Sequence, residues 1–60
     1  MKGQILELNP DGTGMVSLEN GENVNFDNTN LKPRTIFNEG DKIVVNFSNG
    51  ILGTMIKVEG

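Results

Sequence analysis

The sequence predicts an all-β fold, a small barrel of five antiparallel strands that spans residues 1–60 as a single domain. Three observations predict it. Apolar and polar residues alternate with a period of two in five short segments, turn-forming residues separate these segments, and no segment has the periodicity of a full helix. A chain of this length makes one domain of marginal stability, because it buries only about 60% of its unfolded surface.

The first two strands are expected at residues 4–8 and 14–18. In the first, Ile5, Leu6 and Leu8 cannot all face the core unless a β-bulge interrupts the alternation. The second alternates regularly and has small residues before it. Its expected inward residues are Val16 and Leu18, and Met15 is expected to be exposed.

The third strand is expected at residues 22–27, directly after Asn20-Gly21. Asn-Gly between two alternating segments is the strongest short-range hairpin signal, since both residues tolerate positive φ. The second and third strands should therefore be antiparallel neighbours, with Val24 and Phe26 facing the core.

The longest connection, residues 28–38, leads to a fourth strand expected at residues 42–48. A link of this length is near the upper limit of ordinary loops, which favours a functional or mobile segment. One helical turn within residues 29–31 fits its composition. The inward residues expected in the fourth strand are Ile43, Val45 and Phe47.

Asn49-Gly50 predicts a second tight hairpin, followed by a fifth strand at residues 54–58 with Ile56 and Val58 inward. Five short strands with one long link fit a closed or partly closed barrel. An SH3-like barrel is the competing topology, which periodicity alone leaves open.

Composition narrows the classes of function. The chain has no Cys and no His and carries a net charge of −3. Disulfides and the usual zinc ligands are therefore excluded, and no nucleophile or acid–base constellation points to an enzyme. We expect no cofactor and no metal. No apolar stretch reaches the roughly 20 residues that span a membrane, so we expect a cytoplasmic protein.

The order of landmark residues resembles the bacterial cold-shock protein family along almost the whole chain. Gly12–Val16 stands where that family has Gly-Phe-Gly-Phe-Ile, and Asn23–Asn28 stands where it has Asp-Val-Phe-Val-His-Phe. The other matching landmarks are Lys2–Ile5, Asn9, Glu39–Ile43, Asn49-Gly50 and Gly53.

The resemblance implies a five-stranded OB-type barrel that binds single-stranded RNA or DNA by stacking bases on outward aromatic rings. In this chain those rings are replaced, and each lost platform removes about 1–3 kcal/mol per base. Binding of single strands is therefore expected to be weak or atypical. The replacing residues are Glu7, Thr13, Met15, Asn25, Asp27 and Asn28.

Polar and basic residues near these positions are the candidate nucleic-acid contacts. They are Asn9, Thr13, Met15, Asn25, Asn28, Lys32 and Arg34. A solvated outer sheet face and an ordinary loop would also explain every one of them. The alternative function is a protein-interaction module, an accessory or inhibitor factor, on a barrel that no longer binds nucleic acid.

Overall fold

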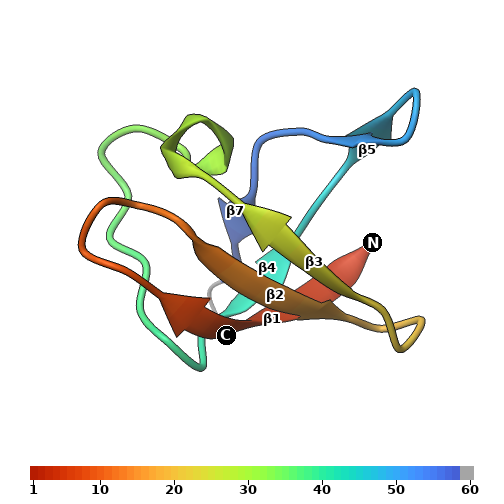
Figure 1. Ribbon diagram of the computed structural model, residues 1–60, viewed down its shortest axis with the longest axis horizontal. Coiled ribbons are helices and arrows are strands. Elements are labelled where there is room, and N and C mark those ends of the chain that lie inside the picture. Colours follow the sequence, from red (N-terminus) through yellow and green to blue (C-terminus); the bar gives the residue numbers. More distant parts are fainter. Residues whose placement is uncertain (59–60) are drawn as a thin grey trace.

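The computed structural model describes residues 1–58 and consists, in that range, of seven short strands and one turn of 3-10 helix (Figure 1). The elements are β1 (Lys2–Leu8), β2 (Gly14–Leu18), β3 (Asn23–Phe26), η1 (Asn28–Asn30), β4 (Lys42–Val44), β5 (Phe47–Ser48), β6 (Ile51–Leu52) and β7 (Ile56–Lys57).

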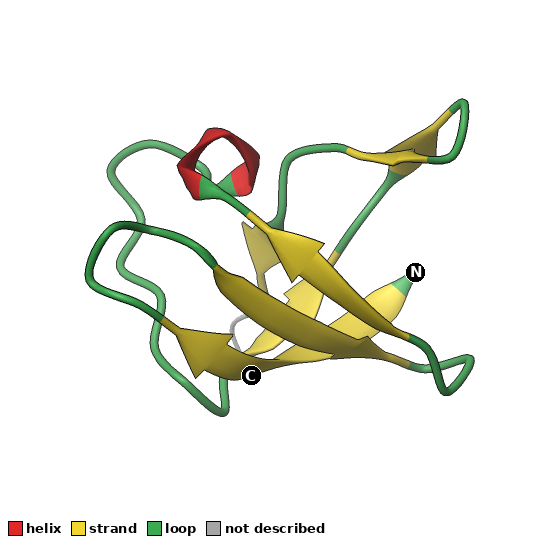
Figure 2. Cartoon of the chain, viewed as in Figure 1, coloured by secondary structure: helices red, strands yellow, loops and turns green. Residues whose placement is uncertain are grey.

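Five of the strands form one antiparallel sheet in the order β3-β2-β1-β4-β7, and β5 and β6 form a separate two-stranded hairpin. Figure 2 shows this hairpin extending away from the five-stranded sheet. The all-β fold and the five antiparallel strands are confirmed. The sheet is not closed into a barrel, however, because β3 and β7 remain its two edges.

One isolated backbone bridge lies between the segment after β3 and the segment before β7, the two edge strands of the sheet. Leu31, just after η1, forms an isolated parallel bridge with Met55, just before β7. The Met55 amide donates to the carbonyl of Asn30 at 2.7 Å. The segment after β3 therefore approaches β7 over a single bridge, which is too short to complete a continuous strand pair.

The bulge expected in the first strand is confirmed. The register of β1 against β2 shifts between Ile5 and Glu7, so Leu6 is the additional residue. Ile5 is buried and Leu6 is 48% exposed. The bulge thus lets Ile5 and Leu8 approach the core while Leu6 points to solvent.

Both Asn-Gly pairs lie in hairpin turns, as expected, but the turns differ. At the β2–β3 turn the Leu18 amide donates to Glu22 at 2.8 Å, and Gly21 has a φ of +91°. At the β5–β6 turn Asn49 and Gly50 both have positive φ, 54° and 78°. Two positive values are what a type I′ turn requires.

The last third of the chain departs from the prediction. The fourth strand does not run from residue 42 to residue 48 but stops at Val44, and pairing resumes only at Phe47. Two residues, Val45 and Asn46, separate β4 from β5. Three residues, Gly53, Thr54 and Met55, separate β6 from β7, which pair with β5 and β4.

This unequal spacing reverses the face predicted for the final strand. Met55 is fully buried, while Ile56 and Val58 are 45% and 42% exposed. One additional residue moves every later side chain to the opposite face of a strand. Phe47, also predicted inward, is 40% exposed.

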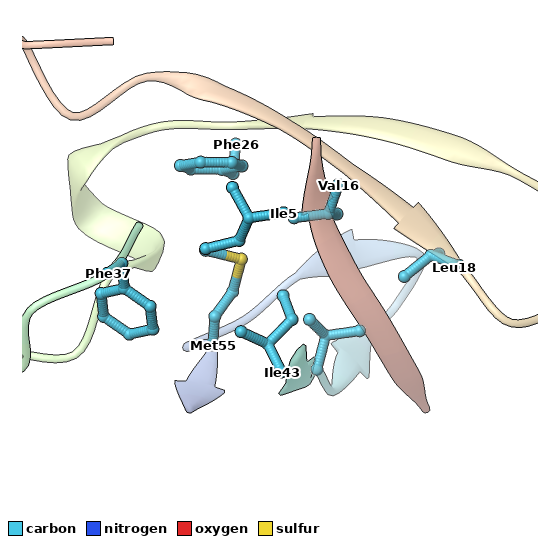
Figure 3. Close-up of a cluster of buried hydrophobic side chains, with 8 residues drawn as sticks. Ile5, Val16, Leu18, Phe26, Phe37, Ile43 and Met55 are labelled. Atoms are coloured by element: carbon cyan, nitrogen blue, oxygen red, sulfur yellow. The ribbon is translucent and has the colours of Figure 1, made fainter. Parts of the chain in front are cut away.

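A single cluster of apolar side chains fills the concave side of the sheet (Figure 3). Met55 lies at its centre, near Phe37 and Ile43. Phe37 comes from the long connection and not from a strand. The buried members are Ile5, Val16, Leu18, Phe26, Phe37, Ile43, Val45 and Met55.

The helical turn expected near residues 29–31 is present as η1. Asp27 caps it by accepting from the Thr29 amide at 2.9 Å, and the Asn30 side chain accepts from the Asp27 amide at 2.9 Å. These reciprocal bonds form a capping box. Within the described residues, no helix has the length and apolar composition needed to cross a membrane.

Candidate binding face

The outer face of β1, β2 and β3 carries the residues that correspond to the predicted site. Register places Glu7 of β1 beside Met15 of β2, and Met15 beside Asn25 of β3. Met15 is half-buried, whereas Glu7 and Asn25 are exposed. This row therefore presents a carboxylate, a thioether and an amide side by side.

No aromatic ring lies in this row. The chain has three Phe and no Tyr or Trp. Phe26 and Phe37 are buried in the core, and Phe47 is on the β5–β6 hairpin. Bases cannot stack on the β1–β3 face as they do on aromatic platforms, so contacts there are limited to hydrogen bonds and the Met15 side chain.

Asn9 and Thr13 belong to a hydrogen-bonded turn between β1 and β2. The Asn9 amide group donates to Thr13 Oγ1 at 3.1 Å, and that hydroxyl donates to Asp11 Oδ1 at 2.6 Å. The bond from the Thr13 hydroxyl, followed by one from the Thr13 backbone amide, lowers the pKa of Asp11 below its ordinary value. The two predicted contact residues therefore first serve to order the turn.

Asn28 lies against the same turn. A Cβ placed on Gly12 would come within 2.6 Å of the Asn28 Cβ, so only glycine permits this approach. Asn28 is exposed, and its side chain has no hydrogen bond within residues 1–58. The β1–β2 turn and η1 thus present Asn9, Thr13 and Asn28 at one end of the outer face.

The same capping arrangement fixes the charge of Asp27. The Thr29 hydroxyl donates to Asp27 Oδ1, and this bond, followed by the one from the Thr29 backbone amide, lowers the pKa of Asp27. Asp27 is exposed and ionised at neutral pH. It therefore adds a negative charge at the end of β3, which repels phosphate.

Lys32 and Arg34 lie in the long connection that follows η1, outside the strands that form the outer face. Both are exposed, and Arg34 has a φ of 65°. In the part of the chain that the structure describes, neither side chain forms a hydrogen bond or ion pair. They are free to bind an anion, but the fold does not bring them into the Glu7–Met15–Asn25 row.

The structure adds a feature that the sequence did not indicate, a shallow hollow of about 490 Å³ on the outer face. Its centre is a row across the sheet in which Gln4 of β1 pairs with Ser17 of β2 and with Lys42 of β4. We call this feature the Gln4 hollow. The side chains that frame it are Lys2, Gln4, Ser17, Glu19, Lys42 and Val58.

Two lysines give the Gln4 hollow a positive rim. Lys2 pairs with Val44, so Lys42 is its diagonal neighbour on the adjacent strand. Diagonal neighbours in an antiparallel pair are typically about 7–8 Å apart. Both lysines are exposed. Glu19 is the one acidic side chain in the lining. The hollow therefore suits an anionic group together with a small polar or flat one.

Alternation alone can place Lys2, Gln4 and Lys42 at outward positions of their strands, but it does not show that they are neighbours. The missing information was strand order, because β1 lies between β2 and β4 only in the folded sheet. Lys57 differs from these lysines. It forms an ion pair with Asp41 at 3.2 Å and donates to the Ile36 carbonyl at 3.2 Å.

No family model, curated protein or solved structure matches this chain. The resemblance to cold-shock proteins therefore stays a prediction.

The described residues also contain no cluster of three or more acidic side chains that could hold a metal ion. What the outer face offers is hydrogen-bond donors and acceptors, two lysines and a hollow, which is chemistry for binding.

Proposed function

We propose that the chain is a non-enzymatic binding module of OB type, similar to cold-shock proteins, which binds single-stranded RNA or DNA weakly across its outer face. The observation that carries the proposal is the Gln4 hollow with Lys2 and Lys42 at its rim. These two lysines can neutralise two phosphates. Gln4 and Ser17 can form hydrogen bonds with sugars or base edges.

Strand order supports the OB assignment. The five strands form one sheet in the order β3-β2-β1-β4-β7, and a short 3-10 helix follows β3. The bridge between Leu31 and Met55 lies where such a barrel would close. OB folds are partly open barrels that bind oligonucleotides on a strand face and through adjacent loops.

Weak affinity follows from charge and from the absence of rings. Glu7, Glu19 and Asp27 surround or flank the proposed path, and the net charge is −3. Without stacking, each nucleotide loses about 1–3 kcal/mol of binding free energy. We expect dissociation constants in the range of non-specific complexes, about 10⁻⁴–10⁻⁶ M.

Fluorescently labelled oligo-dT and oligo-rU, titrated with the full chain at low salt, test the proposal. Two phosphate contacts predict a plot of log K against log[salt] with a slope of about −1.4, at about −0.7 for each contact with a single strand. Absence of binding at ~100 μM protein, in conditions where electrostatic affinity is greatest, rejects the proposal.

Two double variants locate the contacts. One variant is Lys2→Gln with Lys42→Gln, and the other is Lys32→Gln with Arg34→Gln. Each removes two positive charges from the parent chain, whose net charge is −3. The first pair should lower affinity more than the second, because only the first borders the hollow. Equal losses would mean that binding follows net charge and not the outer face.

A second function is favoured by a separate observation. Several apolar side chains are exposed on the segment from β4 to β7, which includes the β5–β6 hairpin. Exposed apolar surfaces are typical of protein contacts. If oligonucleotides fail to bind, a protein-interaction role on this segment becomes the leading proposal, and no stoichiometric partner in a pull-down would count against it. The exposed apolar residues of this segment outside the Gln4 hollow are Phe47, Ile51 and Ile56.

A further inference from the structure

The tips of the two hairpins each carry an Asn-Gly pair, Asn20-Gly21 and Asn49-Gly50. In such a pair the glycine nitrogen can attack the side-chain carbonyl carbon of the asparagine. The new C–N bond replaces the bond to the side-chain nitrogen, which leaves as ammonia with the glycine amide proton. Water then opens the succinimide ring to aspartate or isoaspartate, with no oxidation or reduction.

This reaction needs a glycine N–H that is free and a turn that can change its backbone angles. A hydrogen bond from the glycine N–H, or to the asparagine side chain, must break first. The surrounding hairpin must also open, because the turn geometry keeps nucleophile and carbonyl apart. The rate therefore depends on the local opening free energy of each hairpin.

The Asn20-Gly21 turn is held in place by several bonds. The Gly21 amide donates to the Leu18 carbonyl at 2.9 Å, and the Asn20 side chain accepts from the Glu22 amide at 3.0 Å. This hairpin joins β2 and β3, which pair over four residues and contribute buried side chains to the core. Opening it disturbs the five-stranded sheet.

The Asn49-Gly50 turn lacks these restraints. Among the described residues, no hydrogen bond involves the Gly50 amide or the Asn49 side chain, and both residues are exposed. The hairpin has only two residue pairs, Phe47 with Leu52 and Ser48 with Ile51. It also lies outside the five-stranded sheet, so its opening leaves that sheet intact (Figure 2).

We propose that Asn49 is a site of spontaneous deamidation, with water as co-reactant, and that the fold protects Asn20 from the same reaction. The product adds one negative charge to a chain of net charge −3. Isoaspartate also adds a backbone carbon to the turn, which is incompatible with two-residue type I′ geometry. Deamidation would thus alter the β5–β6 hairpin selectively.

Incubation of the folded full chain in warm, mildly alkaline buffer tests the proposal. Peptide mapping by mass spectrometry locates the gain of one mass unit, and an isoaspartate methyl-transfer assay identifies the product. Asn49 should react at least about tenfold faster than Asn20, which corresponds to about 1.4 kcal/mol of additional opening free energy at the protected turn. Equal rates, or faster reaction at Asn20, would overturn the proposal.

Two controls assign the difference to the fold. In denaturant both turns are unfolded. Because each of the two asparagines is followed by glycine, their deamidation rates should then converge. A persistent preference for Asn49 in denaturant would contradict protection by structure. The Asn49→Gln variant, kept folded, should show no early mass gain; an unchanged rate would place the reaction elsewhere.

Discussion

Glu7 is one residue that we expect to lower the affinity of the outer face for a phosphate chain. It lies beside Met15 in the outer row, at a position where the predicted resemblance to cold-shock proteins implies an aromatic ring. Its carboxylate is exposed, so its effect on a bound phosphate is screened but unfavourable. In the proposed function, Glu7 therefore offers no ring for stacking and repels phosphate.

Glu7→Gln removes the charge and keeps the shape. We expect affinity for oligo-rU to rise a few-fold at low salt and to converge with the parent value as salt screens the charge. The measurement is the titration described above at two salt concentrations. Lower affinity in the variant would mean that Glu7 contributes a favourable contact, which contradicts the proposed path of the strand.

Aspartates at three turns make folding stability sensitive to acid. Hydrogen bonds donated by Thr13 and Thr29 lower the pKa values of Asp11 and Asp27. The hydrogen bond from the Asn38 amide, followed by the interaction with Lys57, lowers the pKa of Asp41. A carboxyl with a lower pKa in the folded state stabilises the fold above its unfolded pKa, about 3.9. This stabilisation is lost as pH falls through the folded pKa.

Thermal unfolding followed by circular dichroism should therefore give a Tm that is steady near neutral pH and falls as pH drops below about 4. Asp27→Asn should reduce this acid dependence, because one of the contributing groups no longer titrates. A Tm that rises on acidification would contradict the hydrogen-bonding roles of these carboxylates.

At the scale of elements, period-two alternation predicted the strands where the pairing is regular. The inward residues of β2 and β3, Val16, Leu18 and Phe26, are buried as expected. The bulge in β1 was also predictable, since three apolar residues competed for one face. Alternation failed for β7 because the register shift between the two hairpin arms arises from backbone pairing, which side-chain polarity does not report.

The face of β7 can be tested by a matched pair of substitutions. Met55→Ala should lower the free energy of unfolding by about 2–5 kcal/mol, since Met55 is fully buried in the core. Ile56→Ala should cost much less, because Ile56 is 45% exposed. Urea denaturation measures both. The opposite ranking would restore the register expected from the sequence.

At the scale of the whole molecule, one residue connects the two edges of the open sheet. The Asn30 side chain donates to the carbonyls of Leu52 at 2.9 Å and Gly53 at 3.1 Å, and its backbone carbonyl accepts from Met55. Asn30 thus connects η1, after β3, with the arm that leads to β7. Sequence reasoning assigned no role to it, because these partners are more than twenty residues away.

Asn30→Ala removes three side-chain hydrogen bonds: the two that Asn30 donates to Leu52 and Gly53, and the one that it accepts from the Asp27 amide. Two carbonyls and one amide are left to find other partners. We expect a loss of about 1–3 kcal/mol in the free energy of unfolding and faster amide exchange at Met55. Asn28→Ala, in the same helical turn, should change neither, since Asn28 is exposed and its side chain has no hydrogen bond in residues 1–58. Equal effects of both substitutions would contradict the connecting role of Asn30.

The candidate site was predictable only in part. The sequence shows polar residues where the predicted resemblance to cold-shock proteins implies aromatic rings. The structure places Met15 and Asn25 side by side, as expected for neighbouring strands. Lys32 and Arg34 lie in the long connection, as the sequence predicted, and outside the Glu7–Met15–Asn25 row. The lysines that border the Gln4 hollow come from segments forty residues apart, so only the strand order brings them together.

A titration followed by two-dimensional amide NMR measures most directly where the molecule binds. Adding oligo-rU at low salt should shift the amide resonances around the Gln4 hollow, those of Lys2, Gln4, Ser17 and Lys42, more than those of Lys32 and Arg34. Shifts confined to the β5–β6 hairpin and β7, or none at saturating oligonucleotide, would contradict binding on the outer face.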